Sequence, residues 1–179
     1  MNKISKEDWQ YLLPFIICSI VLLFTDILKS IDKTKLAYWS GALIAEPYRI
    51  VTSHFIHGDA KHLLINTFGI VIARFCLKVL ELKNNYFFLL FITVIIPIQT
   101  IIFWMIDIYI FKNPISLAIG FSGIIYGINS FILLASIYGK RKFLGLDIGL
   151  NESKQIYQII ATISLVSFFW SLLPGISFI

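Results

Sequence analysis

Charge and cysteine are both scarce in this sequence. Only 14% of the 179 residues are charged, whereas a soluble globular domain carries about 25% charged residues. Disorder is excluded, because disordered segments combine high charge with few aromatic residues, and here 16% of the residues are aromatic. Two cysteines are too few to staple a chain of this length, so a disulfide scaffold is excluded as well.

What the sequence does contain is apolar surface. Hydrophobic residues make up 58% of the chain and the mean hydropathy is +0.85, which is more than a water-soluble globule could hide. The composition therefore predicts an integral membrane protein in contact with the lipid bilayer. The net charge of +5 agrees with this class, because Lys and Arg orient membrane segments. No helix face or arm concentrates this charge, so no nucleic-acid partner is expected.

Five apolar stretches are long enough to cross the hydrocarbon core, which takes about 17–25 residues per helix. They cover residues 10–27, 62–80, 86–106, 115–138 and 156–173. None has the alternating pattern of a membrane strand, and helices are then the only way to satisfy the backbone in lipid. The predicted fold class is an all-α integral membrane bundle, with residues 1–179 as a single domain.

The charges also predict an orientation. Gly139-Lys140-Arg141-Lys142 directly follows the fourth stretch and indicates the cytoplasmic side of the membrane. This places the N-terminus in the cytoplasm as well, and residues 28–61 on the outer side. Trp39 in that segment suits a membrane interface, and Glu46-Pro47 interrupts any continuous helix. We expect residues 28–61 to form a loop embedded in the outer leaflet.

All three histidines, His54, His57 and His62, fall within nine residues. Asp59 is a suitable N-cap for the helix that begins just beyond it. His62 and Asn66 are four residues apart and therefore share one face of this helix. Such a pair either joins two helices by hydrogen bonds or marks a functional site, and the pair alone leaves both interpretations open. A metal site built from the three histidines is a further alternative.

Ser122 stands between glycines in Gly120-Phe121-Ser122-Gly123. Gly123 and Gly127 form a G-x-x-x-G pattern, which helix packing explains. Packing does not require the serine, whereas the unpaired N–H groups at a helix start would stabilise a developing anion. Tyr126 lies one turn further on the same face. With His62 and Asn66 as additional donors, the residues predict an acyl-transfer site that still lacks a general base.

Taken together, these motifs resemble the rhomboid family of intramembrane serine proteases. The likeness covers roughly residues 12–179 and keeps the family's order, on its second and fourth helices. The matching residues are Tyr48-Arg49, Thr52, His57, His62, Asn66, Gly120-Phe121-Ser122-Gly123 and Tyr126. The run from Ala42 to Glu46, leading into Thr52-x-His54-Phe55-x-His57, is most similar to the rhombosortase subgroup, which resembles sorting proteases for C-terminal glycine-rich membrane anchors.

The resemblance implies a role for each matching residue. Ser122 would attack a peptide carbonyl in or near a transmembrane segment and form an acyl-enzyme. His62, Asn66 and the Ser122 backbone N–H would line the oxyanion hole. Tyr126 would support the base, and Arg49 and His57 would stabilise the embedded loop. Gly120 and Gly123 would support the helix start at Ser122. The family implies no cofactor and no metal, a membrane-anchored protein substrate that enters from lipid, and the bacterial inner membrane as location.

The chain departs from the family in one respect. The family's base is a histidine on a sixth helix, in an Ala/Gly-His-x-x-Gly setting, and no histidine follows Ser122 here. The last residues, from Leu173 to Ile179, resemble the loop just ahead of that histidine. We therefore expect five helices of the family's six and negligible activity for the chain as written. His54 or His57 could replace the base only within hydrogen-bond reach of Ser122.

Two other functions compete with a protease. A non-catalytic pseudoprotease of the same fold would bind transmembrane helices without cutting them; the missing base favours it, and the retention of Ser122, His62 and Asn66 opposes it. A membrane metal-binding or transport protein would use the cluster of His54, His57 and His62.

Some polar residues have simpler explanations. Asp26 and Asp107 lie near span ends, where snorkelling to the interface is expected. Gln99 is expected to mark a kink near Pro97. The two cysteines lie inside apolar runs and are expected to be buried free thiols.

Overall fold

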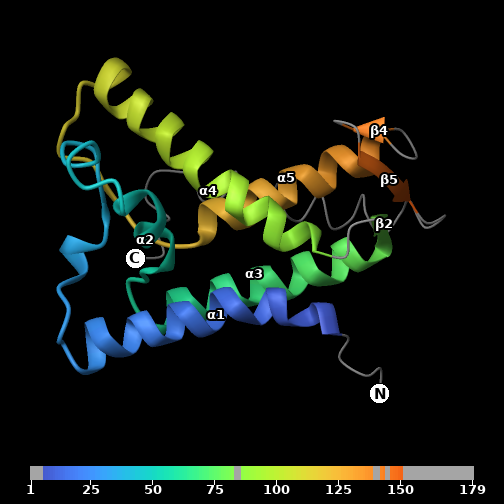
Figure 1. The fold of residues 1–179 in the computed structure, drawn as a ribbon, viewed down its shortest axis with the longest axis horizontal. Helices are drawn as coiled ribbons and strands as arrows, with labels where there is room; N and C mark the ends of the chain where they lie inside the picture. Colours follow the sequence, from blue (N-terminus) through green and yellow to red (C-terminus); the bar gives the residue numbers. More distant parts are fainter. Residues whose placement is uncertain (1–5, 83–85, 139–141, 144–145, 151–179) are drawn as a thin grey trace.

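The fold is a bundle of helices. The structure, a computed structural model, describes residues 6–82, 86–138, 142–143 and 146–150. Its long helices are α1 (Trp9–Leu22), α3 (Ala60–Val79), α4 (Phe87–Met105) and α5 (Ser122–Tyr138). Figure 1 shows α1 and α3 side by side, with α4 and α5 crossing one another above them. A short helix, α2 (Arg49–Phe55), lies at the end of the bundle where the chain returns from α1 to α3.

Within the described residues, three helical segments are long and apolar enough to span a bilayer: Trp9–Ile27, Ala60–Lys78 and Phe87–Ile110. Two of them include a π-helical last turn, η2 (Leu23–Ile27) after α1 and η4 (Ile106–Ile110) after α4. A fourth apolar helical segment, Ser122–Leu134, is shorter. The predicted class of helical membrane bundle is confirmed, while the fifth expected span, residues 156–173, lies outside the described residues.

The start of α3 follows the predicted cap. The side chain of Asp59 accepts a hydrogen bond from the backbone N–H of His62 at 2.7 Å. This contact satisfies one of the N–H groups that a helix start leaves without an intrahelical partner. The predicted N-cap is therefore confirmed, and it sets the first turn on which His62 lies.

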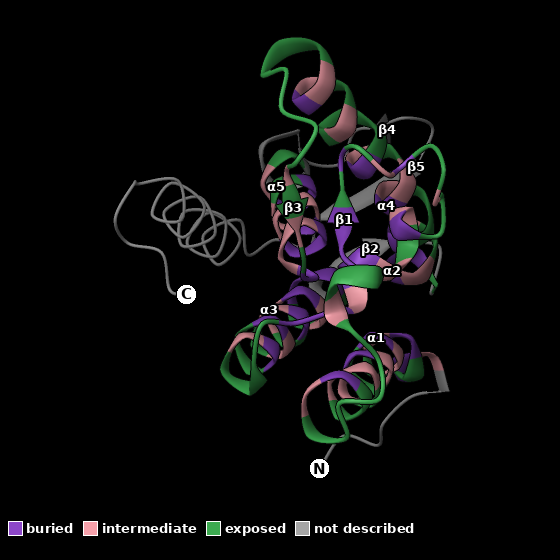
Figure 2. Cartoon of the chain, turned by 90° about the vertical axis from the view of Figure 1, so that its left-hand side faces the viewer, coloured by how far each residue is buried: buried purple, intermediate pink, exposed green. Residues whose placement is uncertain are grey.

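The core lies between α3, α4 and α5, whose buried residues are coloured purple in Figure 2. Gly69 of α3 lets α5 approach, because an added Cβ would lie 2.9 Å from Ile125. Cys18 and Cys76 are buried and free, as predicted. The exposed large side chains on α1 and α4 are apolar, as a lipid-facing surface requires, and include Leu12, Ile16, Ile20, Val94, Ile98 and Ile102.

A two-stranded ladder joins the loops on either side of the site. The loop after α1 contains a 3-10 helix, η3 (Lys33–Lys35), and strand β1 (Tyr38–Trp39), which pairs antiparallel with β3 (Leu117–Ala118). The helix expected from residue 115 begins later, because Leu117 and Ala118 pair with β1 and Gly120 has a φ of 109°, outside the helical range. The helix α5 begins only at Ser122.

A second small sheet lies at the opposite end of the bundle (Figure 1). It contains β2 (Leu80–Leu82), β5 (Leu146–Leu150) and β4 (Lys142–Phe143), in the order β2-β5-β4 with antiparallel neighbours. The two small sheets are short additions to the predicted helical bundle, which stays the main architecture. Both form in connecting segments where the helices have ended, so they need no alternating apolar pattern to be stable.

Polar side chains fasten α1 to its neighbours near this second sheet. Asp8, at the end of the 3-10 helix η1 (Lys6–Asp8), is 3% exposed and forms ion pairs of 2.9 Å with both Arg74 and Lys78 of α3. The side chain of Gln10 accepts a hydrogen bond from the backbone N–H of Leu89 at 3.1 Å, near the start of α4. These contacts fix the register of α1 against α3 and α4.

Candidate active site

Ser122 lines a cavity of about 170 Å³. It is the first residue of α5, where the backbone N–H groups have no intrahelical partner and the helix dipole is positive. The cavity is enclosed by α2, α4, α5 and the β1–β3 ladder, and its lining includes Tyr38, Ser53, His54, Gln99, Thr100, Gly120, Gly123 and Tyr126. A hydroxyl group and helix-terminal donors therefore meet in one partly enclosed polar space.

Gly120 positions the segment that leads into Ser122. Its N–H donates to the carbonyl of Ser53 at 2.9 Å, which ties it to α2. Its φ of 109° is one that other residues rarely adopt. A side chain would also find no space, because an added Cβ would lie 2.9 Å from Cε1 of His62 and 3.8 Å from Nδ2 of Asn66. The structure thus places His62 and Asn66 against the approach to Ser122.

His57 contacts both of these residues. Its Nε2 lies 2.8 Å from Nδ2 of Asn66, and its ring meets the His62 ring edge-on with 5.0 Å between the centroids. His57 is 1% exposed. Burial, together with the neighbouring His62 ring, lowers the pKa of His57 to about 4. His57 is therefore a neutral ring near pH 7 and holds the amide group of Asn66 in place.

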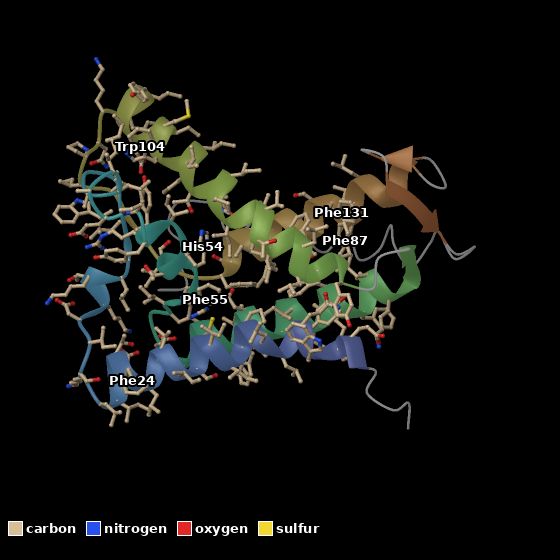
Figure 3. All side chains as sticks on the ribbon, viewed as in Figure 1. Phe24, His54, Phe55, Phe87, Trp104 and Phe131 are labelled. Carbon is tan, nitrogen blue, oxygen red and sulfur yellow. The ribbon has the colours of Figure 1, made fainter. Side chains whose placement is uncertain are left out.

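His54 is the histidine that shares the cavity with Ser122. It lies on α2 and faces α4 (Figure 3), where its Nε2 is 2.9 Å from Oγ1 of Thr100. Burial lowers the pKa of His54 to about 4, against the opposing effect of the carbonyls of Ile96 and Gly120. The ring is neutral near pH 7, and its contact with Thr100 fixes α2 to α4 at the cavity wall.

Gln99 is a cavity residue that the sequence analysis misses. It is expected to mark a kink, but its side chain lies in the cavity with Ser122, directly against Gly123. An added Cβ on Gly123 would overlap the Gln99 amide group. The available signal is that Gln99 is an uncharged polar residue within an apolar span, where polar groups face protein or a cavity rather than lipid.

The other two predicted residues of α5 lie where the sequence suggests. Tyr126 lines the same cavity, one turn beyond Ser122. Gly127 packs against α4, because an added Cβ would lie 3.5 Å from Ile95 and 3.6 Å from Phe91. The G-x-x-x-G pattern is therefore a helix-packing surface, as predicted, and Gly123 adds cavity space to it.

Arg49 lies outside the cavity and organises the loop between α1 and α3. It is 4% exposed, and its Nη1 donates to the carbonyls of Thr34 and Ala37, both at 2.6 Å. Its Nε donates to the carboxylate of Glu46, and this bond lowers the pKa of Glu46. The guanidinium group also lies 5.8 Å from the centre of the Trp39 ring. Arg49 thus holds together segments that no regular element connects.

The loop before α5 is fastened to β1 by side chains. The hydroxyl of Tyr38 donates to Oδ2 of Asp107 at 2.8 Å, and the hydroxyl of Ser40 donates to the carbonyl of Asn113 at 2.8 Å. The expected snorkelling of Asp107 is wrong, because this residue is 3% exposed and its carboxylate is satisfied inside the protein by Tyr38. These contacts hold β3, and through it the start of α5.

The three histidines do not gather around one point. His54 contacts Thr100 on α4, whereas His57 and His62 lie beside Asn66. In the part of the chain that the structure describes, no group of three His, Cys, Asp or Glu side chains is placed to hold a metal ion. The alternative of a histidine-based metal or transport site therefore has no geometric support among these residues.

The structure thus places a serine at a helix start, in a cavity of a helical membrane bundle. Comparison with known proteins gives the family: a sequence model of the Rhomboid domain matches residues 45–179. This match covers more than half of the chain, and the chain therefore belongs to the rhomboid family. No curated protein and no solved structure matches it significantly. The protein is thus an integral membrane protein of a family of intramembrane proteases and pseudoproteases, whose proteases act on membrane-protein substrates.

Proposed function

We propose that this chain is an intramembrane serine endopeptidase that cleaves peptide bonds in or near transmembrane segments. The observation that carries the proposal is the position of Ser122 at the start of α5, in a polar cavity beside the Gly120 segment that His62 and Asn66 contact. The Ser122 oxygen attacks the peptide carbonyl carbon, and its proton passes through a base to the leaving amine. Water then hydrolyses the resulting ester and restores the serine.

The oxyanion of this reaction would be stabilised by His62, Asn66 and the Ser122 backbone N–H. Asn66 has two amide N–H groups, so it can donate one to His57 and the other to the oxyanion. The positive end of the α5 dipole adds to this stabilisation. Removal of one such donor in serine hydrolases lowers kcat by about 10²- to 10³-fold, which is the effect expected for loss of Asn66.

The proton acceptor of this mechanism is not identified among the residues that the structure describes. All three histidines precede Ser122 in the sequence, whereas the base of the family belongs to its sixth helix. His54 shares the cavity with Ser122, but its Nε2 contacts Thr100, and a pKa of about 4 makes it a weak base at neutral pH. This observation favours a second candidate function, a pseudoprotease that binds transmembrane helices at the same cavity without cutting them.

The proposed location is the bacterial inner membrane, with the N-terminus in the cytoplasm. The basic segment after α5 supports this orientation, because Lys and Arg are enriched on the cytoplasmic side. The cavity, which residues of α2 and the β1–β3 ladder line, would then lie on the side of the outer leaflet. A membrane-anchored substrate would enter laterally from lipid. The Thr52-x-His54-Phe55-x-His57 pattern supports, more narrowly, a rhombosortase-like sorting protease.

A cleavage assay in proteoliposomes separates the two candidate functions. The full chain is reconstituted with a panel of single-span membrane proteins that carry a different tag at each end. Ser122→Ala is compared with Ser130→Ala, a control on the same helix whose side chain is exposed. The peptidase predicts fragments from the wild-type protein and the control but none from Ser122→Ala. Equal capture of uncut substrate by all three proteins supports the pseudoprotease, and neither cutting nor capture contradicts both candidates.

A further inference from the structure

Lys33 connects three segments that meet beside the candidate oxyanion site. Its ammonium group lies 2.7 Å from Oδ2 of Asp26, in the last turn of the first span, and donates to the carbonyl of Gly58 at 2.7 Å. Gly58 belongs to the turn that leads into α3. The Lys33 side chain is only 26% exposed, so it is held in this position and does not project into solvent.

The backbone at Gly58 also faces His62. The Gly58 nitrogen lies 3.5 Å from Nδ1 of His62, and an added Cβ on Gly58 would lie 3.8 Å from the same atom. On the far side of the imidazole, Nε2 and Cε1 are the atoms that face Gly120. The ring of His62 is therefore held between the Gly58 turn and the segment that leads into Ser122.

This arrangement determines which ring nitrogen carries the proton. A backbone N–H can only donate, so Nδ1 of a neutral His62 must accept, and the ring proton must then lie on Nε2. The geometry points to Lys33 as a positioning residue, which holds the turn at Gly58 so that His62 keeps its proton on Nε2 and presents a donor toward the segment before Ser122. The catalytic meaning of this inference rests on the proposed function, but the tautomer itself can be measured without it.

Lys33 is the contact that makes this orientation stable. At 3.5 Å the bond from Gly58 to His62 is long and weak, whereas the bond from Lys33 to the Gly58 carbonyl is short and charge-assisted. Gly58 is exposed, so without Lys33 the backbone angles of this glycine turn are no longer fixed, and its N–H can move away from the ring. Proton placement on Nδ1 then becomes possible, and the side of the ring that faces Gly120 becomes an acceptor.

The test is ¹⁵N NMR of the full chain in nanodiscs at neutral pH, with ¹⁵N-labelled histidine. The His62 signals are assigned by their loss in His62→Gln, and pyrrole-type and pyridine-type nitrogen shifts report the tautomer. The wild-type protein is expected to show Nε2–H alone, and Lys33→Met a mixture of both tautomers. Lys33→Arg, whose guanidinium can still donate to Gly58, should restore the wild-type signals. The matched control is Lys35→Met, an exposed lysine of the same short helix.

A Lys33→Met protein with wild-type His62 signals would overturn the inference. If Lys33→Met disturbs the fold, the signals of His54 will change as well, and Asp26→Asn then decides, because it weakens only the anchor of Lys33. A wild-type tautomer in Asp26→Asn would equally overturn the inference, and a partial shift would support it.

The reaction of Ser122 with a fluorophosphonate separates this inference from the proposed function. If the peptidase function and the role of Lys33 are both correct, Lys33→Met slows this reaction by about tenfold. This effect is smaller than that of losing a whole oxyanion donor. A tautomer shift in a protein whose Ser122 never reacts leaves the role of Lys33 intact and contradicts the peptidase. A reactive Ser122 together with an unshifted tautomer supports the peptidase and overturns the role of Lys33.

Discussion

His54 and His57 are neutral rings inside the loop between α1 and α3, because burial lowers both pKa values to about 4. In the unfolded chain their pKa returns to about 6.5. Between these two values the unfolded chain binds more protons than the folded one, so stability falls as the pH decreases. Both rings also bridge neighbouring elements, to Thr100 and to Asn66. Acid should therefore weaken this loop before it titrates the carboxylates.

The first prediction is a loss of stability between pH 6.5 and about 4, the range set by these two histidines. Each pKa unit corresponds to about 1.4 kcal/mol, so each ring can lower the free energy of unfolding by up to about 3 kcal/mol. The apparent Tm in detergent, measured across this range, should fall, and the fall should be smaller in His54→Gln. The carboxyls of Asp32 and Glu46, whose pKa values are lowered, contribute only at more acidic pH. An equally steep fall in His54→Gln would contradict this assignment.

Gly120 gives the second prediction. Gly120→Ala forces a positive φ on a residue with a side chain and drives Cβ toward the His62 ring, which lies 2.9 Å away. Strain of this kind destabilises by about 1–3 kcal/mol. We expect a lower apparent Tm and a displaced His62, seen as altered ring signals in the NMR experiment. Gly127→Ala is the matched control, because its Cβ would make only ordinary contacts with α4. Equal Tm values for the two variants would contradict the close approach at Gly120.

At the scale of elements, the loop between α1 and α3 depends on one buried guanidinium. Arg49 donates to the carbonyls of Thr34 and Ala37 and to Glu46, and together these contacts connect η3, β1 and α2. A lysine keeps the charge but lacks the planar fork that reaches several acceptors at once. Hydrogen bonds from this one side chain therefore connect three elements of the loop.

The third prediction follows from this dependence. Arg49→Gln should lower the free energy of unfolding by about 3 kcal/mol, because it leaves buried acceptors without their charged donor. Arg49→Lys should fall between Arg49→Gln and the wild-type protein. The readouts are the apparent Tm and the rate of limited proteolysis within residues 28–59, which should rise in the order wild type, Arg49→Lys, Arg49→Gln. Wild-type values for Arg49→Gln would contradict the role given to this residue.

The sequence predicts some elements better than others for a physical reason. Apolar length predicts α1, α3 and α4 well, because a helix in lipid must satisfy its own backbone; each begins within two residues of the expected position. The start of α5 is not predictable in this way, because residues 115–121 continue the same apolar run. The helix starts only at Ser122 for two reasons. Residues of this run pair with β1, far earlier in the chain, and Gly120 has a positive φ.

The candidate site is predictable only in part. His62, Asn66 and Ser122 stand out because polar residues are unusual in apolar spans. Gln99 carries the same signal, but a single amide is equally compatible with a kink, and only the close approach of Gly123 places it in the cavity. Asp107 is misread because its partner is Tyr38, 69 residues away. Pairings over such distances leave no trace in a local pattern.

For the molecule as a whole, the two ends of the bundle are stabilised differently. The end with the cavity is held by loop hydrogen bonds, whereas the other end is held by the ion pairs of Asp8 with Arg74 and Lys78. These pairs connect α1 to α3 near the membrane surface. Asp8 is almost fully buried, while its two partners are 37% and 44% exposed. Loss of the Asp8 carboxylate should therefore destabilise the fold more than loss of either basic partner.

The fourth prediction concerns this fastening. Asp8→Asn should lower the free energy of unfolding by about 2 kcal/mol, because hydrogen bonds to charged groups contribute about that much. The apparent Tm should fall, and the fall should shrink at high salt, which screens the ion pairs of the wild-type protein. Glu7→Gln removes a neighbouring carboxylate and serves as the matched control. A Tm shift no larger than that of the control would contradict the fastening role of Asp8.

The proposed function depends above all on Ser122 acting as a nucleophile that its place at the start of α5 activates. The most direct measurement is the mass of the full protein after reaction with a fluorophosphonate, followed by peptide mapping of the modified residue. We expect a single adduct, located on Ser122, that is absent from Ser122→Ala and retained in Ser130→Ala. Equal modification of the wild-type protein and Ser122→Ala, or an adduct located on another serine, would contradict it.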